Sequence, residues 1–142
     1  MTTIDTNTTK TGKGWTIGLW IAQAALAAMF LMAGFMKLTS APAEMVAMGL
    51  AWVENAPVIL IRFIGLAEVA GAVGLILPAA TRIMPELTKL AAAGLAVIMV
   101  LAAAFHIYRG ELEVVPMNAV LFALAAFVIW GRTKKAPIAP RS

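Results

Sequence analysis

The stretch that decides the fold is residues 57–80, PVILIRFIGLAEVAGAVGLILPAA, in which the only charged side chains are Arg62 and Glu68. About 20 consecutive apolar residues suffice to cross the hydrocarbon core of a bilayer as a helix. Three further runs of this kind cover residues 15–36, 87–107 and 114–131. Because backbone polar groups in lipid must bond within the chain, each run is predicted to be a membrane-spanning helix.

The composition supports a membrane protein and excludes several other classes. Hydrophobic residues make up 62% of the chain and charged residues 13%, against about 45–50% and about 25% in soluble domains. So few charges cannot cover a water-facing exterior, which excludes a soluble domain and a disordered chain. The eleven basic residues form no recognition helix or basic stripe, so nucleic acid is excluded as a partner.

The counts of cysteine and histidine limit the cofactors. The chain has no cysteine and one histidine. Disulfides, thiolate metal sites and iron–sulfur ligation are therefore excluded within this chain. A histidine-rich metal site and a bis-histidine haem would need a partner chain, so no metal or haem is predicted.

The domain organisation follows from the apolar runs. We expect a flexible N-terminus over residues 1–14, a four-helix transmembrane domain over residues 15–131, and a basic tail over residues 132–142. The first run continues well beyond Ala22-Gln23-Ala24, which favours an uncleaved span over a signal peptide. Short connections make neighbouring helices antiparallel, so the predicted fold is an all-α, up-down-up-down bundle.

The first outer loop, residues 37–56, is not plainly polar. Ser40-Ala41-Pro42 is typical of a helix start, and Met45, Met48 and Trp52 follow at helical spacing. This pattern predicts a short interfacial helix on the outer membrane face or over the mouth of the bundle. The alternative is a loop that packs on lipid without a function.

The basic residues predict the orientation. Two of them, Lys37 and Arg109, fall on one side of the four spans, and Arg62 lies within a span. The other side collects Lys10, Lys13, Arg82, Lys89, Arg132, Lys134, Lys135 and Arg141. Since cytoplasmic loops carry the excess of Lys and Arg, both termini are predicted to be cytoplasmic.

The polar residues inside the spans are the candidate site. At about 1.5 Å per residue, Arg62 is roughly 8 Å and Glu68 roughly 17 Å below the outer boundary, and Gln23 is expected near the level of Glu68. A charge facing lipid at mid-helix costs roughly 2.5–3.5 kcal/mol, so these side chains are expected to turn toward one another. We predict a polar pocket open to the outer face and floored by Glu68 and Gln23; its residues are Gln23, Lys37, Arg62, Glu68, His106 and Asn118.

Each of these residues also has an interpretation without a ligand. Lys37 and Arg62 can snorkel to the headgroups, His106 can be a hydrogen-bonded packing residue, and Asn118 can hold helices together. Glu68 is the strongest signal, because a mid-membrane carboxyl must be paired or protonated. Gln23 and Lys37 are further expected to share a helix face with Ala27, Phe30 and Gly34.

Three segments carry a family resemblance. Residues 30–38, FLMAGFMKL, end the first span with a small–Gly pair and Lys-Leu, and residues 65–75, GLAEVAGAVGL, are followed by Leu77-Pro78. The third segment is Ala104-Phe105-His106. Together they resemble the DoxX-like family of membrane proteins, over about residues 15–131. The positions that match the family pattern are Lys37, Glu68 and His106.

The resemblance implies a bacterial inner-membrane protein with a loose link to redox systems, because a related subunit belongs to thiosulfate:quinone oxidoreductases. We therefore expect a quinone-linked or otherwise redox-associated membrane subunit, with Glu68 and His106 as candidate catalytic groups. Lys37, Arg62 and His106 would donate hydrogen bonds to a quinone, and Glu68 would exchange protons. Electrons would come from a partner redox protein or directly from a substrate.

Two other functions remain open at this point. The chain can be a non-enzymatic accessory or scaffold subunit of a larger membrane complex, in which the polar network only fixes helix register. It can also bind or transport a small molecule, and a homo-oligomer would extend the path that one protomer offers. Whether the chain is an enzyme is left undecided by the sequence.

Overall fold

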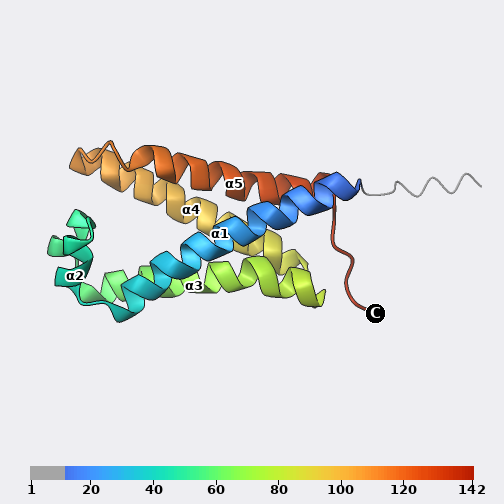
Figure 1. The fold of residues 1–142 in the computed structure, drawn as a ribbon, viewed down its shortest axis with the longest axis horizontal. Helices are drawn as coiled ribbons and strands as arrows, with labels where there is room; N and C mark the ends of the chain where they lie inside the picture. Colours follow the sequence, from blue (N-terminus) through green and yellow to red (C-terminus); the bar gives the residue numbers. More distant parts are fainter. Residues whose placement is uncertain (1–11) are drawn as a thin grey trace, which may run out of the picture.

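The computed structural model describes residues 12–142, and every regular element in that range is helical. The four long helices are α1 (Lys13–Thr39), α3 (Val58–Thr81), α4 (Glu86–Arg109) and α5 (Val115–Lys134), each long and apolar enough to span a membrane. A short helix, α2 (Pro42–Ala47), and a 3₁₀ turn, η1 (Ala51–Asn55), connect α1 to α3 (Figure 1). The predicted all-α membrane fold is confirmed. Most of the predicted flexible N-terminus, residues 1–11, lies outside the described residues.

All four long helices end beyond their predicted last residues, and α1 and α5 extend furthest. α1 continues to Thr39, because the Thr39 hydroxyl donates to the Phe35 carbonyl and the Ser40 N–H donates to the Met36 carbonyl, both at 2.9 Å. α5 continues to Lys134, so Arg132 belongs to a helix and not to the predicted basic tail. This extension matters because it brings a cation into the bundle.

The long helices change partners along the bundle. Figure 1 shows consecutive long helices running in alternating directions, with α1 crossing from α3 at the end that carries α2 to α5 at the other end. We call these the α2 end and the tail end. Glycines mark both contacts of α1: Gly34 lies against Gly65 of α3, and Gly131 of α5 lies against Leu19. Close packing of small residues is how membrane helices associate without a hydrophobic driving force.

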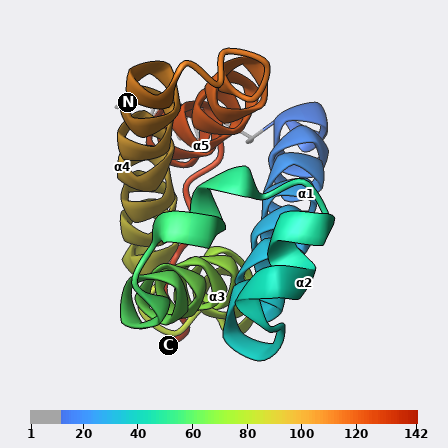
Figure 2. The ribbon, with the colours of Figure 1, turned by 90° about the vertical axis from the view of Figure 1, so that its left-hand side faces the viewer.

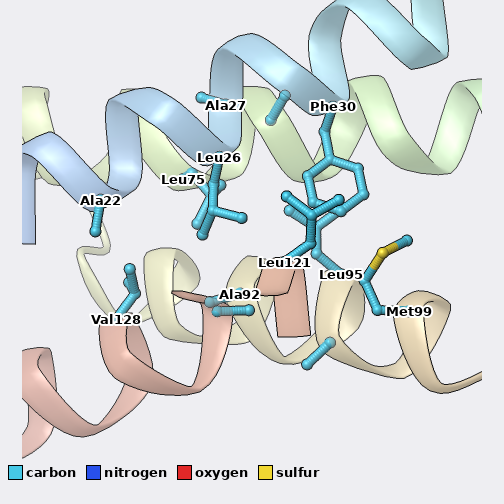
Figure 3. Close-up of a cluster of buried hydrophobic side chains, with 13 residues drawn as sticks. Ala22, Leu26, Ala27, Phe30, Leu75, Ala92, Leu95, Met99, Leu121 and Val128 are labelled. Atoms are coloured by element: carbon cyan, nitrogen blue, oxygen red, sulfur yellow. The ribbon is translucent and has the colours of Figure 1, made fainter. Parts of the chain in front are cut away.

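The apolar core lies where all four long helices meet. Figure 3 shows Leu26 of α1 beside Leu75 of α3, and Phe30 of α1 pointing toward Leu95 of α4 and Leu121 of α5. The lipid-facing side of each helix is equally apolar, as expected for a bundle in hydrocarbon, so burial separates the two faces better than hydropathy does. The stripe predicted for α1 is confirmed, since the following residues are all buried: Gln23, Ala27, Phe30, Gly34 and Lys37.

The connection from α1 to α3 folds over the α2 end. Met45 of α2 and Val53 of η1 are fully buried and pack with Ile61 of α3. Figure 2 shows α2 and η1 lying across the ends of α1 and α3. Trp52 reaches α4, where its ring centroid is 6.2 Å from that of Phe105. The predicted short helix is therefore present, and it covers the end of the bundle.

Candidate functional site

The centre of the site is an ion pair between Lys37 of α1 and Glu68 of α3. The Lys37 Nζ donates to both carboxylate oxygens of Glu68, at 2.8 Å and 3.0 Å. The two side chains are 10% and 6% exposed. Of the two alternatives for Glu68, the paired one is confirmed, and Lys37 turns into the bundle instead of toward the headgroups.

A glycine contact sets the register that brings these two charges together. A Cβ added to Gly34 would lie 2.7 Å from the Gly65 carbonyl oxygen, and one added to Gly65 would lie 2.9 Å from the Gly34 carbonyl oxygen. The backbones of α1 and α3 therefore touch, and the Cβ of Lys37 lies against Gly65. From that position the four-carbon stem of Lys37 reaches Glu68, which follows Gly65 on the same buried stripe of α3.

Arg62 binds backbone and not Glu68. Its guanidinium donates to the Lys37 carbonyl and, at 3.0 Å, to the Ser40 carbonyl. The last carbonyls of a helix have no partner within the helix, and a cation near them also interacts favourably with the helix dipole. Arg62 therefore caps α1 directly beside the ion pair and fixes the start of the connection to α2.

Asn118 lies in the first turn of α5, at the α2 end of the bundle. At this end α1 lies against α3, and the contact of α1 with α5 is at the other end. The Nδ2 of Asn118 is buried and has no hydrogen-bond partner among residues 12–142.

His106 belongs to a separate cluster at the rim of the α2 end. Its Nδ1 lies 2.7 Å from the carboxylate of Glu111, and the Arg109 Nε donates to the same carboxylate at 2.8 Å. These side chains are between 14% and 27% exposed. Hydrogen bonds from His106 and then Arg109 hold the pKa of Glu111 below its ordinary value. The cluster ties the loop after α4 to the end of that helix.

Gln23 lies far from the ion pair, so the prediction that Gln23 and Glu68 together form the floor of one pocket is wrong. Its Nε2 donates to the Leu75 carbonyl at 2.6 Å, and its Oε1 accepts from the Arg132 Nε at 2.6 Å. In the register set by Gly34 and Gly65, Gln23 is about 12 Å from Glu68 along the axis. The sequence-based depth assumed that each helix starts at the membrane boundary, whereas α1 is longer than its span and crosses between two partners.

Two polar residues at the tail end were missed by the sequence analysis, Arg132 of α5 and Thr88 of α4. They are 4% and 1% exposed. Arg132 continues the buried stripe formed by Leu121, Ala125 and Val128, at helical spacing. That periodicity was the available signal, but the run of basic residues after Gly131 favoured a solvated tail.

Two cavities accompany these clusters, and neither is lined by Lys37, Glu68 or His106. The larger, about 310 Å³, is an apolar groove between α1 and α3, formed where α1 leaves α3. Its floor includes Ala27 and Ala72, and Ala72 is one helical turn from Glu68. The smaller cavity, about 10 Å³, lies between Thr88 and Arg132 at the tail end.

Of the six predicted pocket residues, the structure brings Lys37, Glu68 and Arg62 together, and Asn118 of α5 lies outside this hydrogen-bonded cluster. His106 lies at the rim and Gln23 in the tail-end network. No curated protein and no solved structure is significantly similar to the chain. A family model described as the DoxX-like family matches residues 21–128, which include the ion pair and most of the four spans. The chain is therefore a multi-pass membrane protein and belongs to the DoxX-like family.

Proposed function

We propose that the protein is a redox-associated membrane subunit that binds the head group of a quinone at the α2 end, with the Lys37–Glu68 pair and Asn118 as its candidate polar groups. The observation that carries this proposal is the Nδ2 of Asn118, a buried donor without a partner in residues 12–142, at the same end of the bundle as a buried ion pair. A buried unsatisfied donor costs about 1–3 kcal/mol, so such a group needs a reason.

The polar groups at the α2 end have the chemistry that a quinone head group would need. A quinone ring offers two carbonyl oxygens as hydrogen-bond acceptors, and Asn118 has a free N–H to donate. Lys37 has three N–H donors and directs two of them at Glu68. When bound, a quinone supplies a two-electron, two-proton acceptor. In this proposal the Glu68 carboxylate releases or takes up the proton, and Lys37 holds that carboxylate in place.

The apolar groove offers a path for the isoprenoid tail. Quinones of membranes carry a long hydrocarbon chain, which needs an apolar surface next to the head group. The groove between α1 and α3 begins at Ala72, one turn from Glu68, and its lining atoms are almost all apolar. Residues four apart on a helix lie on the same face, so head group and tail can follow one side of α3.

The binding test uses tryptophan fluorescence, because quinones quench it and Trp52 lies at the α2 end. The purified chain in detergent is titrated with a short-tailed benzoquinone. Replacing Asn118 by leucine removes the free donor without breaking a bond in the described chain. We expect Asn118→Leu to raise the unfolding free energy by about 1–3 kcal/mol and to weaken quinone binding about tenfold.

The exposed carboxylate of Glu54 provides the control. Glu54→Gln changes an exposed carboxylate at the same end and should leave quinone binding unchanged. Glu68→Gln should weaken binding if it still folds; Asn118→Leu tests the proposal if it does not. Equal affinities for the wild type, Asn118→Leu and Glu54→Gln would place the quinone elsewhere and refute the proposed site.

A non-enzymatic accessory role is the second candidate, and one observation favours it. The charges of Lys37, Glu68 and Arg62 are already satisfied by one another or by backbone carbonyls. In this case the ion pair fixes the register of α1 and α3, and the exposed helix faces contact a partner redox protein or a second copy. Native mass spectrometry of the purified protein distinguishes the two: bound quinone supports the first, and a stoichiometric partner without quinone supports the second.

The proposal includes an orientation in a bacterial inner membrane, with both termini in the cytoplasm. Figure 1 supports it, because α1 begins and α5 ends at the tail end, where Lys13, Lys134 and Lys135 lie. The chain has no cysteine, so single cysteines can be introduced as Glu54→Cys and Ser142→Cys. A membrane-impermeant maleimide added to spheroplasts should label the first and not the second. The opposite labelling would refute the orientation.

A further inference from the structure

The tail end holds a second buried polar network, which does not depend on the proposed quinone site. Arg132 of α5 donates from Nε to Gln23 of α1 and, at 3.2 Å, from Nη1 to the Ala136 carbonyl. The guanidinium carbon also lies over the ring of Trp20, 5.3 Å from its centroid. Helix α1 and the C-terminal segment therefore fix the position of this guanidinium of α5.

Two polar atoms in this network are left without a partner. They are the Nη2 of Arg132 and the Oγ1 of Thr88, and neither finds a hydrogen-bond partner within residues 12–142. Both residues line the same small cavity, and both are more than nine-tenths buried. Two such atoms at one cavity indicate a small bound species that the protein itself does not supply.

The charge around the cavity is positive. Arg132 forms no ion pair with a carboxylate in the described part of the chain. The N-terminus of α4, at Glu86, lies at the same cavity, has no side-chain cap, and carries the positive end of the helix dipole. Glu86 also lines the cavity, but its carboxylate is 76% exposed and binds Lys89. A buried guanidinium without a counter-charge is costly, and a bound anion would remove that cost.

We propose that this cavity binds one small inorganic anion of the halide class, held by the Nη2 of Arg132 and the Oγ1–H of Thr88. The cavity, about 10 Å³, has room for one species near the size of a water molecule, which excludes phosphate and carboxylate. The anion would neutralise Arg132 and hold its guanidinium toward α4. Because Nη1 of the same group binds the Ala136 carbonyl, the anion would also hold the C-terminal segment against the bundle.

The C-terminal segment closes this site. Ile138 lines the cavity, and the Arg141 N–H donates to the Arg82 carbonyl at 2.9 Å, which ties the segment to the turn between α3 and α4. Figure 1 shows the segment running from the end of α5 across the tail end. This segment shields a bound ion from water. The attraction between the ion and Arg132 is stronger in such a site than it would be in water.

The test is the thermal unfolding of the purified full chain in detergent, with sodium chloride exchanged for sodium gluconate at constant ionic strength. Gluconate is too large for the cavity, so chloride should raise the unfolding midpoint in a saturable way. Thr88→Val removes the hydroxyl and keeps the shape of the side chain. We expect it to weaken the apparent chloride affinity about tenfold, as for a lost hydrogen bond to a charged group.

The matched control is Thr133→Val, on the same helix as Arg132. The hydroxyl of Thr133 is exposed and donates to the Ile129 carbonyl, so this variant should keep the chloride response. Equal midpoints in chloride and gluconate would show that the cavity holds water and would overturn the proposal. A chloride response that survives unchanged in Thr88→Val would place the ion elsewhere and would overturn it as well.

Discussion

Replacing Lys37 by methionine tests how strongly the buried ion pair holds α1 against α3. Methionine keeps most of the length of lysine and removes the charge. Lys37→Met leaves the Glu68 carboxylate, now only 6% exposed, without the two hydrogen bonds of 2.8 Å and 3.0 Å that it accepts. Removing one member of a buried pair costs about 3–5 kcal/mol, so we expect a loss of that size in the free energy of unfolding.

The other variants of the cycle should behave differently. Glu68→Leu leaves Lys37 unpaired, but Lys37 lies near the end of α1 and its long stem can carry the ammonium toward the headgroups. Its loss of stability should therefore be smaller than that of Lys37→Met. The double variant, Lys37→Met with Glu68→Leu, removes both charges, and replacing a buried pair by apolar groups is neutral or stabilising by about 1–4 kcal/mol.

The assay is equilibrium unfolding of the purified protein in mixed micelles, followed by helical circular dichroism for all four members of the cycle. Lys89→Met is the matched control, because Lys89 pairs with Glu86 on the surface and an exposed pair contributes only about 0.2–1 kcal/mol. The reasoning is refuted if Lys37→Met loses no more than this control. It is also refuted if the double variant loses the sum of the two single losses.

Two further predictions concern the backbone contact between Gly34 and Gly65 and the ion pairs of Glu111 at the rim of the α2 end. Gly34→Ala should cost about 1–3 kcal/mol, since its Cβ would lie 2.7 Å from the Gly65 carbonyl oxygen, whereas Gly94→Ala, with open space around it, should be neutral or stabilising in the same unfolding assay. Because the pKa of Glu111 is lowered in the folded protein from its ordinary value of 4.5, its stabilising effect is present above that pH and is lost as the pH falls through the folded pKa. The midpoint of the wild type should therefore exceed that of Glu111→Gln at pH 7, and the difference should vanish in acid; a difference that persists unchanged in acid would contradict this.

The sequence was sufficient for the number and the approximate position of the spans, because a membrane imposes a length and an internally bonded backbone. It also identified Glu68, since a carboxylate in the middle of an apolar helix is energetically unfavourable unless it is paired or protonated. The buried stripe of α1 followed from helical spacing alone. These predictions depend on one helix at a time.

The pairing of polar residues depends on two helices at once, and here the sequence was insufficient. Gln23 was expected beside Glu68 and lies instead beside Arg132, because α1 crosses from α3 to α5 along its length. A depth counted from the start of each run cannot include this crossing. The same limit hid Arg132, whose place on the buried stripe of α5 is clear only when the helix is known to continue to Lys134.

The choice of partner for Lys37 shows what decides such pairings. A charge can be neutralised by any opposite charge within reach, and long side chains tolerate several registers. The backbone contact between Gly34 and Gly65 tolerates only one, because any side chain at either position would meet a carbonyl oxygen at less than 3 Å. The glycines therefore set the register of α1 on α3, and the pairing of Lys37 with Glu68 follows from it. A variant that moves Gly34 away from Gly65 should loosen the ion pair too, whereas removal of both charges should leave this backbone contact in place.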